Sequence, residues 1–211
     1  MMNGELTDKS MKTFLDELSS SAPAPGGGSV AALSGALGAA LISMVSNLTI
    51  GKKKYTDVQK EIIELLKKSE RLRKELIDLL EADIKVYTEL SQTMKMPRDT
   101  DEQKTARAKA MDKALKAATD VPMRVAEACV SVMDLCRPAA ERGNVNAVSD
   151  VGVGVLMAEA GLRSAALNVL INLGWIKDES FVSESRTKLD ALLKGKPASR
   201  DEIYELVASK L

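Results

Sequence analysis

The segment that decides the fold spans residues 56–94 and reads TDVQKEIIELLKKSERLRKELIDLLEADIKVYTELSQTM. Its apolar side chains recur three or four residues apart, and most of the positions between them are charged or polar. This spacing predicts one long amphipathic helix that ends before Pro97 and turns a single apolar stripe toward a core. The stripe consists of Ile62, Leu65, Leu72, Leu76, Leu79, Leu80, Tyr87 and Leu90.

Helical periodicity continues on both sides of this segment, and no stretch alternates with the period of two that is typical of strands. The sequence therefore predicts an all-α fold, a single-domain bundle of long helices that spans residues 1–211. Besides the helix over 56–94, we expect helices over Thr7–Ser20, Val30–Thr49, Asp101–Thr119, Pro122–Arg142 with a kink or an early end at Pro138, Asn144–Leu173, Glu179–Leu193 and Ser199–Leu211.

The composition excludes several classes of function. The 30 Lys and Arg residues balance the 30 Asp and Glu residues, so no net charge attracts nucleic acid. Aromatic residues make up only 3% of the chain, which leaves few rings to stack on bases. The chain has no histidine, which rules out Ser-His-Asp and Cys-His catalysis and histidine metal sites. Acid–base chemistry must fall to other groups.

The cysteines and the first residues indicate a cytoplasmic protein. Cys129 and Cys136 lie seven residues apart, which is not the spacing of a zinc pair, and we expect both to be small core side chains. Residues 1–12 carry charged side chains and lack the apolar core of a signal peptide. A reducing compartment is consistent with both observations.

The uncharged segment from Ser29 to Ile50 has two interpretations. It is long enough to cross a bilayer and three lysines follow it closely. Half of its residues are Ala, Gly or Ser, however, and the neighbouring predicted helices are amphipathic and charged, as in a bundle in water. We therefore expect a helix buried at the centre of the bundle, and no membrane association.

Asp83 occupies a position on the apolar stripe where the pattern calls for leucine. A carboxylate that faces a core needs polar partners, a pocket or a raised pKa, because burial of its unsupported charge is costly. A raised pKa suits a general acid–base that works near neutral pH. The alternative is a structural aspartate at the edge of the stripe, bonded to a helix end or a lysine. Periodicity alone leaves both possibilities open.

A run of three glycines precedes the uncharged segment. Gly26, Gly27 and Gly28 would let a ligand approach the backbone, and Ser29 is a candidate N-cap for the following helix. The spacing Gly26-x-Gly28-x-x-Ala31 matches the dinucleotide fingerprint, but no strand precedes it and no βαβ unit follows, so we reject that assignment. A flexible turn between two helices is an equally good interpretation.

Two further segments hold polar residues that could meet a ligand. Lys52, Lys53 and Tyr55 follow a predicted helix C-terminus, where cations complement the helix dipole, and the lysines are alternatively an anchor for a carboxylate-bearing ligand. Asn144 is a candidate N-cap of the last large apolar helix. Asp150 lies one turn further along, among valines, and is a second carboxylate in apolar surroundings.

Several separated motifs resemble the cyclodeaminase domain of the formiminotransferase–cyclodeaminase family, in the same order and over nearly the whole chain. The Pro-Gly-Gly-Gly-Ser opening is the most distinctive, since it is unusual for a helical protein. The resembling motifs are those of the cyclodeaminase domain alone, so we expect the chain to be similar to the stand-alone members. The motifs are Ala24–Ala32, Ser43–Val45, Leu48–Tyr55, Glu81–Asp83, Gly143–Asn144, Ser149–Asp150 and Asn168–Leu173.

The resemblance implies an all-α homodimer with a folate site in a cleft. It assigns the catalytic aspartate to Asp83, the second acid of an Asp-Ala-Asp element in which this chain has Glu81 as the first acid. The residues that the resemblance places along the folate cleft are Gly26, Gly27, Gly28, Ser29, Asn47, Lys52, Lys53, Tyr55, Asn144 and Asp150.

The implied reaction converts 5-formimino-tetrahydrofolate into 5,10-methenyl-tetrahydrofolate and ammonia, with no metal or redox cofactor. Asp83 would accept the N10 proton and deliver it to the departing nitrogen, while the lysines attract the glutamate tail, including that of a polyglutamylated folate. One alternative is a methenyltetrahydrofolate cyclohydrolase, in which water attacks the methenyl carbon. Another is a non-catalytic folate-binding or helical scaffold protein, in which Asp83 is structural.

Overall fold

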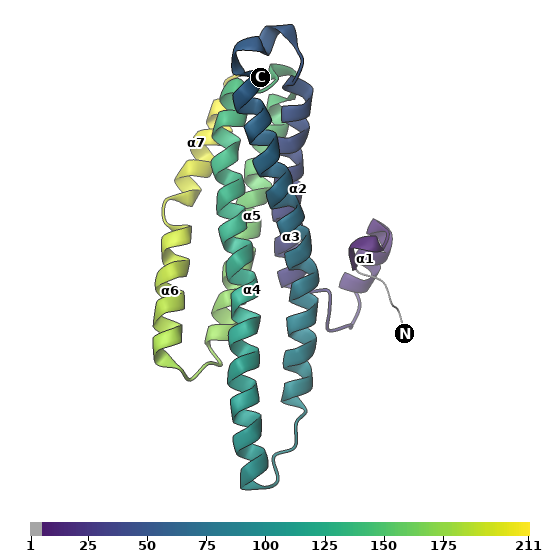
Figure 1. Ribbon diagram of the computed structural model, residues 1–211, viewed down its shortest axis with the longest axis vertical. Coiled ribbons are helices and arrows are strands. Elements are labelled where there is room, and N and C mark those ends of the chain that lie inside the picture. Colours follow the sequence, from purple (N-terminus) through teal and green to yellow (C-terminus); the bar gives the residue numbers. More distant parts are fainter. Residues whose placement is uncertain (1–5) are drawn as a thin grey trace.

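The computed structural model describes residues 6–211, and this part of the chain folds into helices without a strand. Four long helices run side by side along the long axis of the molecule (Figure 1). The predicted all-α class and the bundle of long helices are therefore confirmed. The four helices are α2 (Gly27–Thr49), α3 (Gln59–Met94), α4 (Asp101–Arg142) and α5 (Val148–Leu173).

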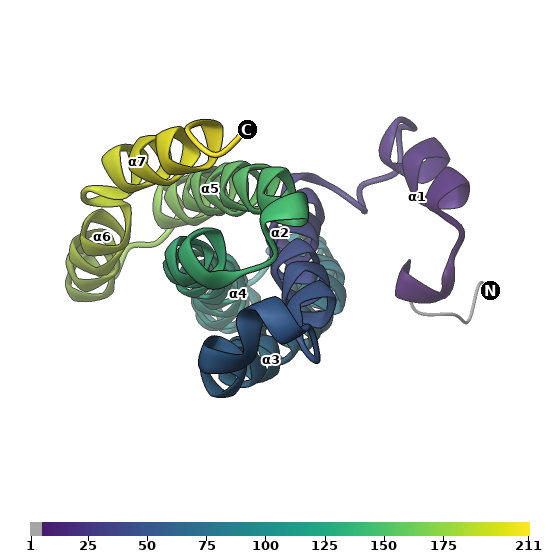
Figure 2. The ribbon, with the colours of Figure 1, turned by 90° about the horizontal axis from the view of Figure 1, so that it is seen from above.

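Shorter elements surround this body. Seen from above, α6 and α7 lie on one side of the bundle, next to α4 and α5, whereas α1 stands on the opposite side (Figure 2). Short 3-10 turns precede α1, α3 and α5. The bounds of these elements are η1 (Leu6–Asp8), α1 (Met11–Leu18), η2 (Lys53–Val58), η3 (Val145–Ala147), α6 (Glu179–Leu193) and α7 (Lys196–Ala208).

The apolar helix α2 packs closely against α5 because both helices have glycines at the contact. A Cβ atom on Gly38 would lie 2.8 Å from the carbonyl oxygen of Gly154 on α5. A Cβ on Gly161 of α5 would likewise lie 2.9 Å from the carbonyl oxygen of Ala31. Two segments, Gly27–Thr49 and Val145–Leu173, are long and apolar enough to cross a membrane by length and composition. In the bundle α2 packs against α3, α4 and α5, which agrees with the expected buried central helix.

The apolar stripe of α3 is buried as predicted, with one exception. Seven of its eight members, from Ile62 to Leu90, are buried, whereas Tyr87 is 43% exposed. The cause is the position at which α2 begins, since Gly28 in its first turn already lies opposite Asp83. Beyond that level α2 no longer covers α3, and Tyr87 faces a groove instead of a packed helix.

The prediction of two separate helices over Asp101–Arg142 is wrong, because α4 continues through both of its prolines. Pro122 has no N–H to donate to the carbonyl oxygen of Ala118 one turn earlier. The side-chain nitrogen of Asn172 on α5 donates to that carbonyl instead, at 2.7 Å. A side chain from another helix thus replaces the missing backbone hydrogen bond.

The predicted start of the second helix also needs correction. We expected a helix from Val30 with Ser29 as its N-cap, but α2 already begins at Gly27, with Gly26 as the N-cap. No side chain caps this end. Ser29 lies inside the first turn and is fully buried, so its hydroxyl is available to a partner on α3.

Candidate active site

Asp83 lies on α3 opposite the first turn of α2, where the glycine run and Ser29 meet it. The Ser29 hydroxyl donates a hydrogen bond to Asp83 Oδ2 at 2.9 Å. A Cβ atom on Gly28 would lie 2.1 Å from Asp83 Oδ1, so only a glycine leaves room for the carboxylate in this position. The structure thus brings together Asp83 and the glycine segment, which are 54 residues apart in the chain.

The surroundings of Asp83 alter its acidity. Burial raises the pKa of the Asp83 carboxyl above its ordinary value, and this effect outweighs the hydrogen bonds from the Ser29 side chain and backbone, which lower it. A carboxyl group with a raised pKa holds its proton at a higher pH than an exposed aspartate does. The raised pKa therefore makes the Asp83 carboxyl a better proton donor for acid–base catalysis than an exposed aspartate.

A groove with a volume of about 290 Å³ opens beside Asp83, between α3, α4 and α5. This volume is close to the lower limit of ordinary small-molecule sites. Two large aromatic side chains flank the groove, Tyr87 on α3 and the 71% exposed Trp175 after α5. The groove therefore combines a proton-transfer group with flat apolar surfaces. Its remaining lining residues are Val86, Leu90, Met94, Leu115, Ala118, Pro122, Asn168, Ile171 and Asn172.

Two asparagines one helical turn apart on α5 supply the amide groups of the groove. The side-chain nitrogen of Asn168 donates to the Ser164 carbonyl oxygen at 2.8 Å, and that of Asn172 to the Ala118 carbonyl oxygen. A Cβ on Gly27 would lie 3.6 Å from the Asn168 side chain, so this amide also adjoins the glycine run. With their nitrogens bound to backbone, the amide oxygens are left to accept hydrogen bonds from a ligand.

The resemblance includes the motif Asn168–Leu173 without assigning its residues to the site. Two further groove residues are not predicted by the sequence: Tyr87, which the apolar stripe places in the core, and Trp175. One available signal was the pair Asn168 and Asn172 at a spacing of four on a largely apolar helix, because such a spacing places both amides on one face.

The other residues assigned to the folate cleft lie at the opposite end of α2. Gly28 and Asn47 are 19 residues apart on this helix, which corresponds to ~28 Å at 1.5 Å per residue. A single chain therefore does not bring the two groups together. The group at the far end consists of Asn47, Lys52, Lys53, Tyr55, Asn144 and Asp150.

Several contacts at this far end hold the helices together. The Asn144 side chain accepts a hydrogen bond from the Asn146 N–H and donates one to the Leu48 carbonyl oxygen at 2.8 Å. The Tyr55 hydroxyl accepts a hydrogen bond from the Val145 N–H at 3.0 Å. The expected role of Asn144 as the N-cap of the large apolar helix is wrong, because Asn144 caps the short turn η3 and the N-cap of α5 is Ala147. Asn47, Lys52 and Lys53 are exposed, and Asp150 is half-buried.

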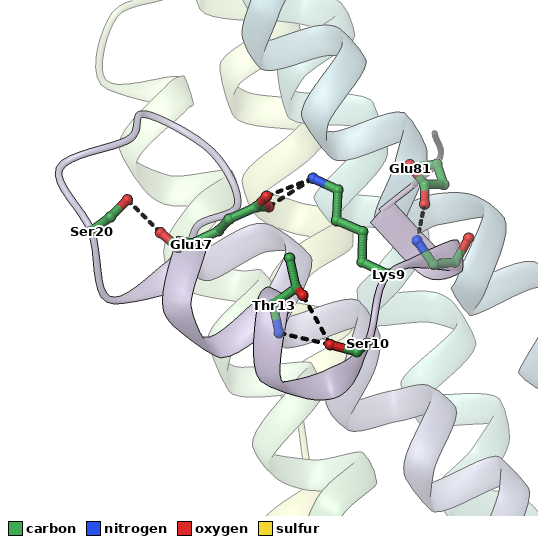
Figure 3. A network of polar contacts seen from close by, with 7 residues as sticks. Lys9, Ser10, Thr13, Glu17, Ser20 and Glu81 are labelled. Carbon is green, nitrogen blue, oxygen red and sulfur yellow. Dashed lines mark hydrogen bonds and ion pairs between the residues drawn. The ribbon is translucent and has the colours of Figure 1, made fainter. Parts of the chain in front are cut away.

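Glu81, the first acid of the Glu-Ala-Asp element, contacts the N-terminal segment. Its Oε1 accepts a hydrogen bond from the Thr7 N–H at 2.7 Å (Figure 3). The same close-up shows Lys9 paired with Glu17, and Ser10 capping α1 by accepting from the Thr13 N–H. Glu81 therefore has a structural partner of its own, which leaves Asp83 as the carboxylate of this element that lines the groove.

The two cysteines are unsuited to nucleophilic catalysis. Cys129 and Cys136 are both fully buried, as predicted, and neither forms a disulfide. Burial raises the pKa of each thiol to about 12. Because the thiolate is the reactive form, neither sulfur is a nucleophile at neutral pH.

The model of the family described as Formiminotransferase-cyclodeaminase matches residues 10–191, which is most of the chain. The chain belongs to this family. Its membership supports an enzyme that acts on a folate derivative, and the predicted resemblance is confirmed.

The chain is similar both to a protein named as a cyclohydrolase and to proteins named as cyclodeaminases. It is 48% identical to the methenyltetrahydrofolate cyclohydrolase of Methylorubrum extorquens, over 97% of this chain and 98% of that protein. It is 35% identical to the formimidoyltransferase-cyclodeaminase of Sus scrofa over 90% of this chain, but it spans only 35% of that longer protein. The crystal structure of formiminotetrahydrofolate cyclodeaminase from Thermotoga maritima superposes with a TM-score of 0.80 at 31% identity, covering 98% of both chains.

Proposed function

We propose that this chain is a cytoplasmic enzyme that hydrolyses 5,10-methenyl-tetrahydrofolate to 10-formyl-tetrahydrofolate, with Asp83 as its general acid–base. The observation that carries the proposal is the partly buried Asp83 carboxylate between Gly28, Ser29 and an aromatic-lined groove. The choice of the hydrolytic activity rests on the 48% identity, over the full length of both proteins, with a methenyltetrahydrofolate cyclohydrolase.

In this reaction water attacks the methenyl carbon, which lies between N5 and N10 and shares their positive charge. Asp83 takes one proton of the water as the carbon–oxygen bond forms. The bond between this carbon and N5 then breaks, Asp83 returns its proton to N5, and the hydroxyl proton leaves to solvent. The product carries the formyl group on N10, and one proton is released overall. Each step needs only a positioned carboxylate, so we propose that no metal or redox cofactor takes part.

The second candidate activity is the cyclodeaminase reaction, which the full-length similarity to the Thermotoga maritima enzyme favours. The substrate 5-formimino-tetrahydrofolate enters protonated on its imino nitrogen, and N10 attacks the formimino carbon. Asp83 accepts the N10 proton and passes it to the same nitrogen, which departs as ammonia and leaves the positive charge on the methenyl product. Both reactions pass through a tetrahedral carbon between N5 and N10. One carboxylate in one position can therefore serve either reaction.

The two activities are separated by offering each substrate to the purified protein. The absorbance of the methenyl group fades during hydrolysis and grows during cyclodeamination. Asp83→Asn keeps the shape of the side chain but cannot accept a proton, so we expect turnover to fall by ~10²–10⁴-fold. Near-normal turnover by this variant would remove Asp83 from the mechanism. Folate binding without turnover of either substrate by the wild type would favour the non-catalytic alternative.

We further propose that the enzyme is a homodimer formed through the outer face of α2 and α5. These adjacent helices expose a row of large apolar side chains, and contiguous apolar patches on a protein surface commonly mark interfaces. Two-fold association around the middle of α2 would set the Asn47 end of one protomer beside the Gly28 end of its partner. The exposed side chains are Leu37, Met44, Leu48, Val153, Leu156, Leu167, Leu170 and Ile171.

A charge on this face tests the dimer. Leu37→Glu and Leu156→Glu each place a carboxylate within the row, so we expect monomers in sedimentation equilibrium and a matching loss of activity. Lys109→Glu adds a carboxylate to the exposed surface of α4 and is the control that should stay dimeric. Dimers that persist in both leucine variants would place the interface elsewhere.

A further inference from the structure

A second cavity adjoins the groove beside Asp83 at Trp175. This neighbouring cavity has a volume of about 220 Å³ and shares Leu115 and Trp175 with the first. It lies between α4 and the turn that follows α5, and its far wall includes Arg107 and Lys177. Together the two adjoining cavities define a path, with Asp83 on the lining of the groove and a pair of basic side chains on the lining of the neighbouring cavity.

Aromatic side chains are concentrated in the middle of this path. Trp175 is the only tryptophan in the chain, and Tyr87 is one of three tyrosines. Both are well exposed, Trp175 at 71% and Tyr87 at 43%, although a chain with only 3% aromatic residues has few rings to leave in solvent. Flat apolar rings on either side of a groove suit an aromatic ring of the ligand.

The far end of the path has an unsatisfied cationic group. Arg107 Nη2 donates to the Met94 carbonyl oxygen at 3.2 Å, but its Nε is buried and has no hydrogen-bond partner among the described residues. Arg107 lines the cavity, and a guanidinium is a preferred partner of a carboxylate. The one acidic side chain that lines this cavity, Asp112, is already paired with Lys116 at 3.0 Å. The net charge at this end therefore favours an anion.

The length and order of these groups match one half of the substrate. From Asp83 to Met94, beside which Arg107 lies, α3 advances eleven residues, or ~16 Å, and the arginine side chain spans part of that distance. In a tetrahydrofolate, N10 is attached to a benzoyl ring, which an amide links to a glutamate with two carboxylates. The sequence of reacting nitrogen, ring and carboxylates parallels that of Asp83, the aromatic pair and Arg107.

We propose that this path binds the p-aminobenzoyl-glutamate half of the substrate, with the benzoyl ring between Tyr87 and Trp175 and a glutamate carboxylate on Arg107. The proposal rests on the proposed function, because Asp83 defines where N10 must lie. It also assigns the first glutamate to Arg107 rather than to the lysines at positions 52 and 53. The pterin then occupies the side of Asp83 nearer to the glycine run.

Because Trp175 is the only tryptophan, its fluorescence reports on this path alone, and the test needs no turnover. The probe is p-aminobenzoyl-glutamate, with p-aminobenzamide as the probe that keeps the ring and the amide but has no carboxylate. We expect p-aminobenzoyl-glutamate to quench the wild type, and Arg107→Gln to weaken that binding roughly tenfold without changing the response to p-aminobenzamide. Lys109→Gln, on an exposed part of the same helix, is the matched control and should bind like the wild type.

Steady-state kinetics with the complete substrate give the second test. Arg107→Gln should raise KM roughly tenfold and leave kcat nearly unchanged, since Arg107 is remote from the reacting carbon. The proposal is overturned if Lys52→Gln with Lys53→Gln raises KM while Arg107→Gln does not, or if a tetrahydropterin quenches Trp175 and p-aminobenzoyl-glutamate does not. A wild type that turns over neither substrate would instead overturn the proposed function, and the fluorescence result would still stand.

Discussion

The Asp83 carboxylate occupies the space that a side chain at position 28 would fill. A Cβ atom on Gly28 would lie 2.1 Å from Oδ1, 2.6 Å from Cγ and 2.8 Å from Oδ2 of Asp83. All three distances are shorter than real Cβ contacts. The absence of a side chain at position 28 therefore allows the Asp83 carboxylate on α3 to lie against the backbone of α2.

Gly28→Ala should displace the Asp83 carboxylate and leave the fold intact. Alanine is a better helix former than glycine, so the circular dichroism spectrum should be unchanged. A shift of the carboxylate by about 1 Å can lower a rate by roughly 10²-fold, and we expect a fall in kcat of that order. Gly26→Ala is the comparison, because its Cβ would meet no atom within 4 Å, and its effect on kcat should be much smaller. A larger fall in kcat for Gly26→Ala than for Gly28→Ala would contradict this account.

Ser29→Ala should move the acidic limb of the pH–rate profile to higher pH. The Ser29 hydroxyl donates to Asp83 Oδ2 and lowers the pKa of this carboxyl, so its removal raises the pKa further. A general base works only when it is ionised. The rise of kcat/KM for hydrolysis with pH should therefore occur at a higher pH in Ser29→Ala than in the wild type. The control is Ser34→Ala, since the Ser34 hydroxyl bonds to the Val30 carbonyl of its own helix. An unshifted limb in Ser29→Ala would show that this hydroxyl does not tune the catalytic base.

Asp83→Asn should be at least as stable as the wild type at pH 8. The pKa of Asp83 is higher in the folded protein than in the unfolded chain, because burial disfavours the charged form. The folded state therefore loses stability as the pH rises from the ordinary carboxyl pKa, ~3.9, through the raised value. Asparagine has no charge to bury, so its thermal midpoint relative to the wild type should increase between pH 4 and pH 8. A relative midpoint that falls over this range would mean that the folded state favours the ionised form.

Asn172→Ala should destabilise the protein by ~1–2 kcal/mol through the carbonyl group of Ala118, which would lose its only side-chain donor. Pro122→Ala restores an N–H that can donate to this carbonyl within α4. In the Pro122→Ala background, Asn172→Ala should therefore lower the free energy of unfolding by much less. Urea unfolding of the four proteins gives the coupling free energy. Equal costs in both backgrounds would show that Asn172 does not compensate for the proline.

The long helices could be predicted from the sequence because each has a local pattern. The apolar stripe over residues 56–94 and its interruption at Asp83 are both properties of consecutive residues. The helix break near Pro122 was predicted wrongly because the compensating donor, Asn172, is 50 residues away in the sequence. The local rule for proline is valid, but a tertiary contact outweighs it here.

The candidate site was predictable where one residue breaks a pattern and not where several elements meet. Asp83 and the glycine run stand out within their own segments, and the fold brings them together. Trp175 and Arg107 have no local pattern that marks them. Their importance depends on α3, α4 and the end of α5 enclosing one path, and no short stretch of sequence contains that information.

The deep burial of both native thiols has a practical consequence for labelling experiments. With a pKa of about 12, Cys129 and Cys136 carry almost no thiolate at neutral pH and react slowly with maleimides in the folded protein. A cysteine introduced on the exposed surface, at Lys177 for example, would be the only fast-reacting thiol. A dye or spin label could thus be attached at the basic end of the path without first replacing either native cysteine.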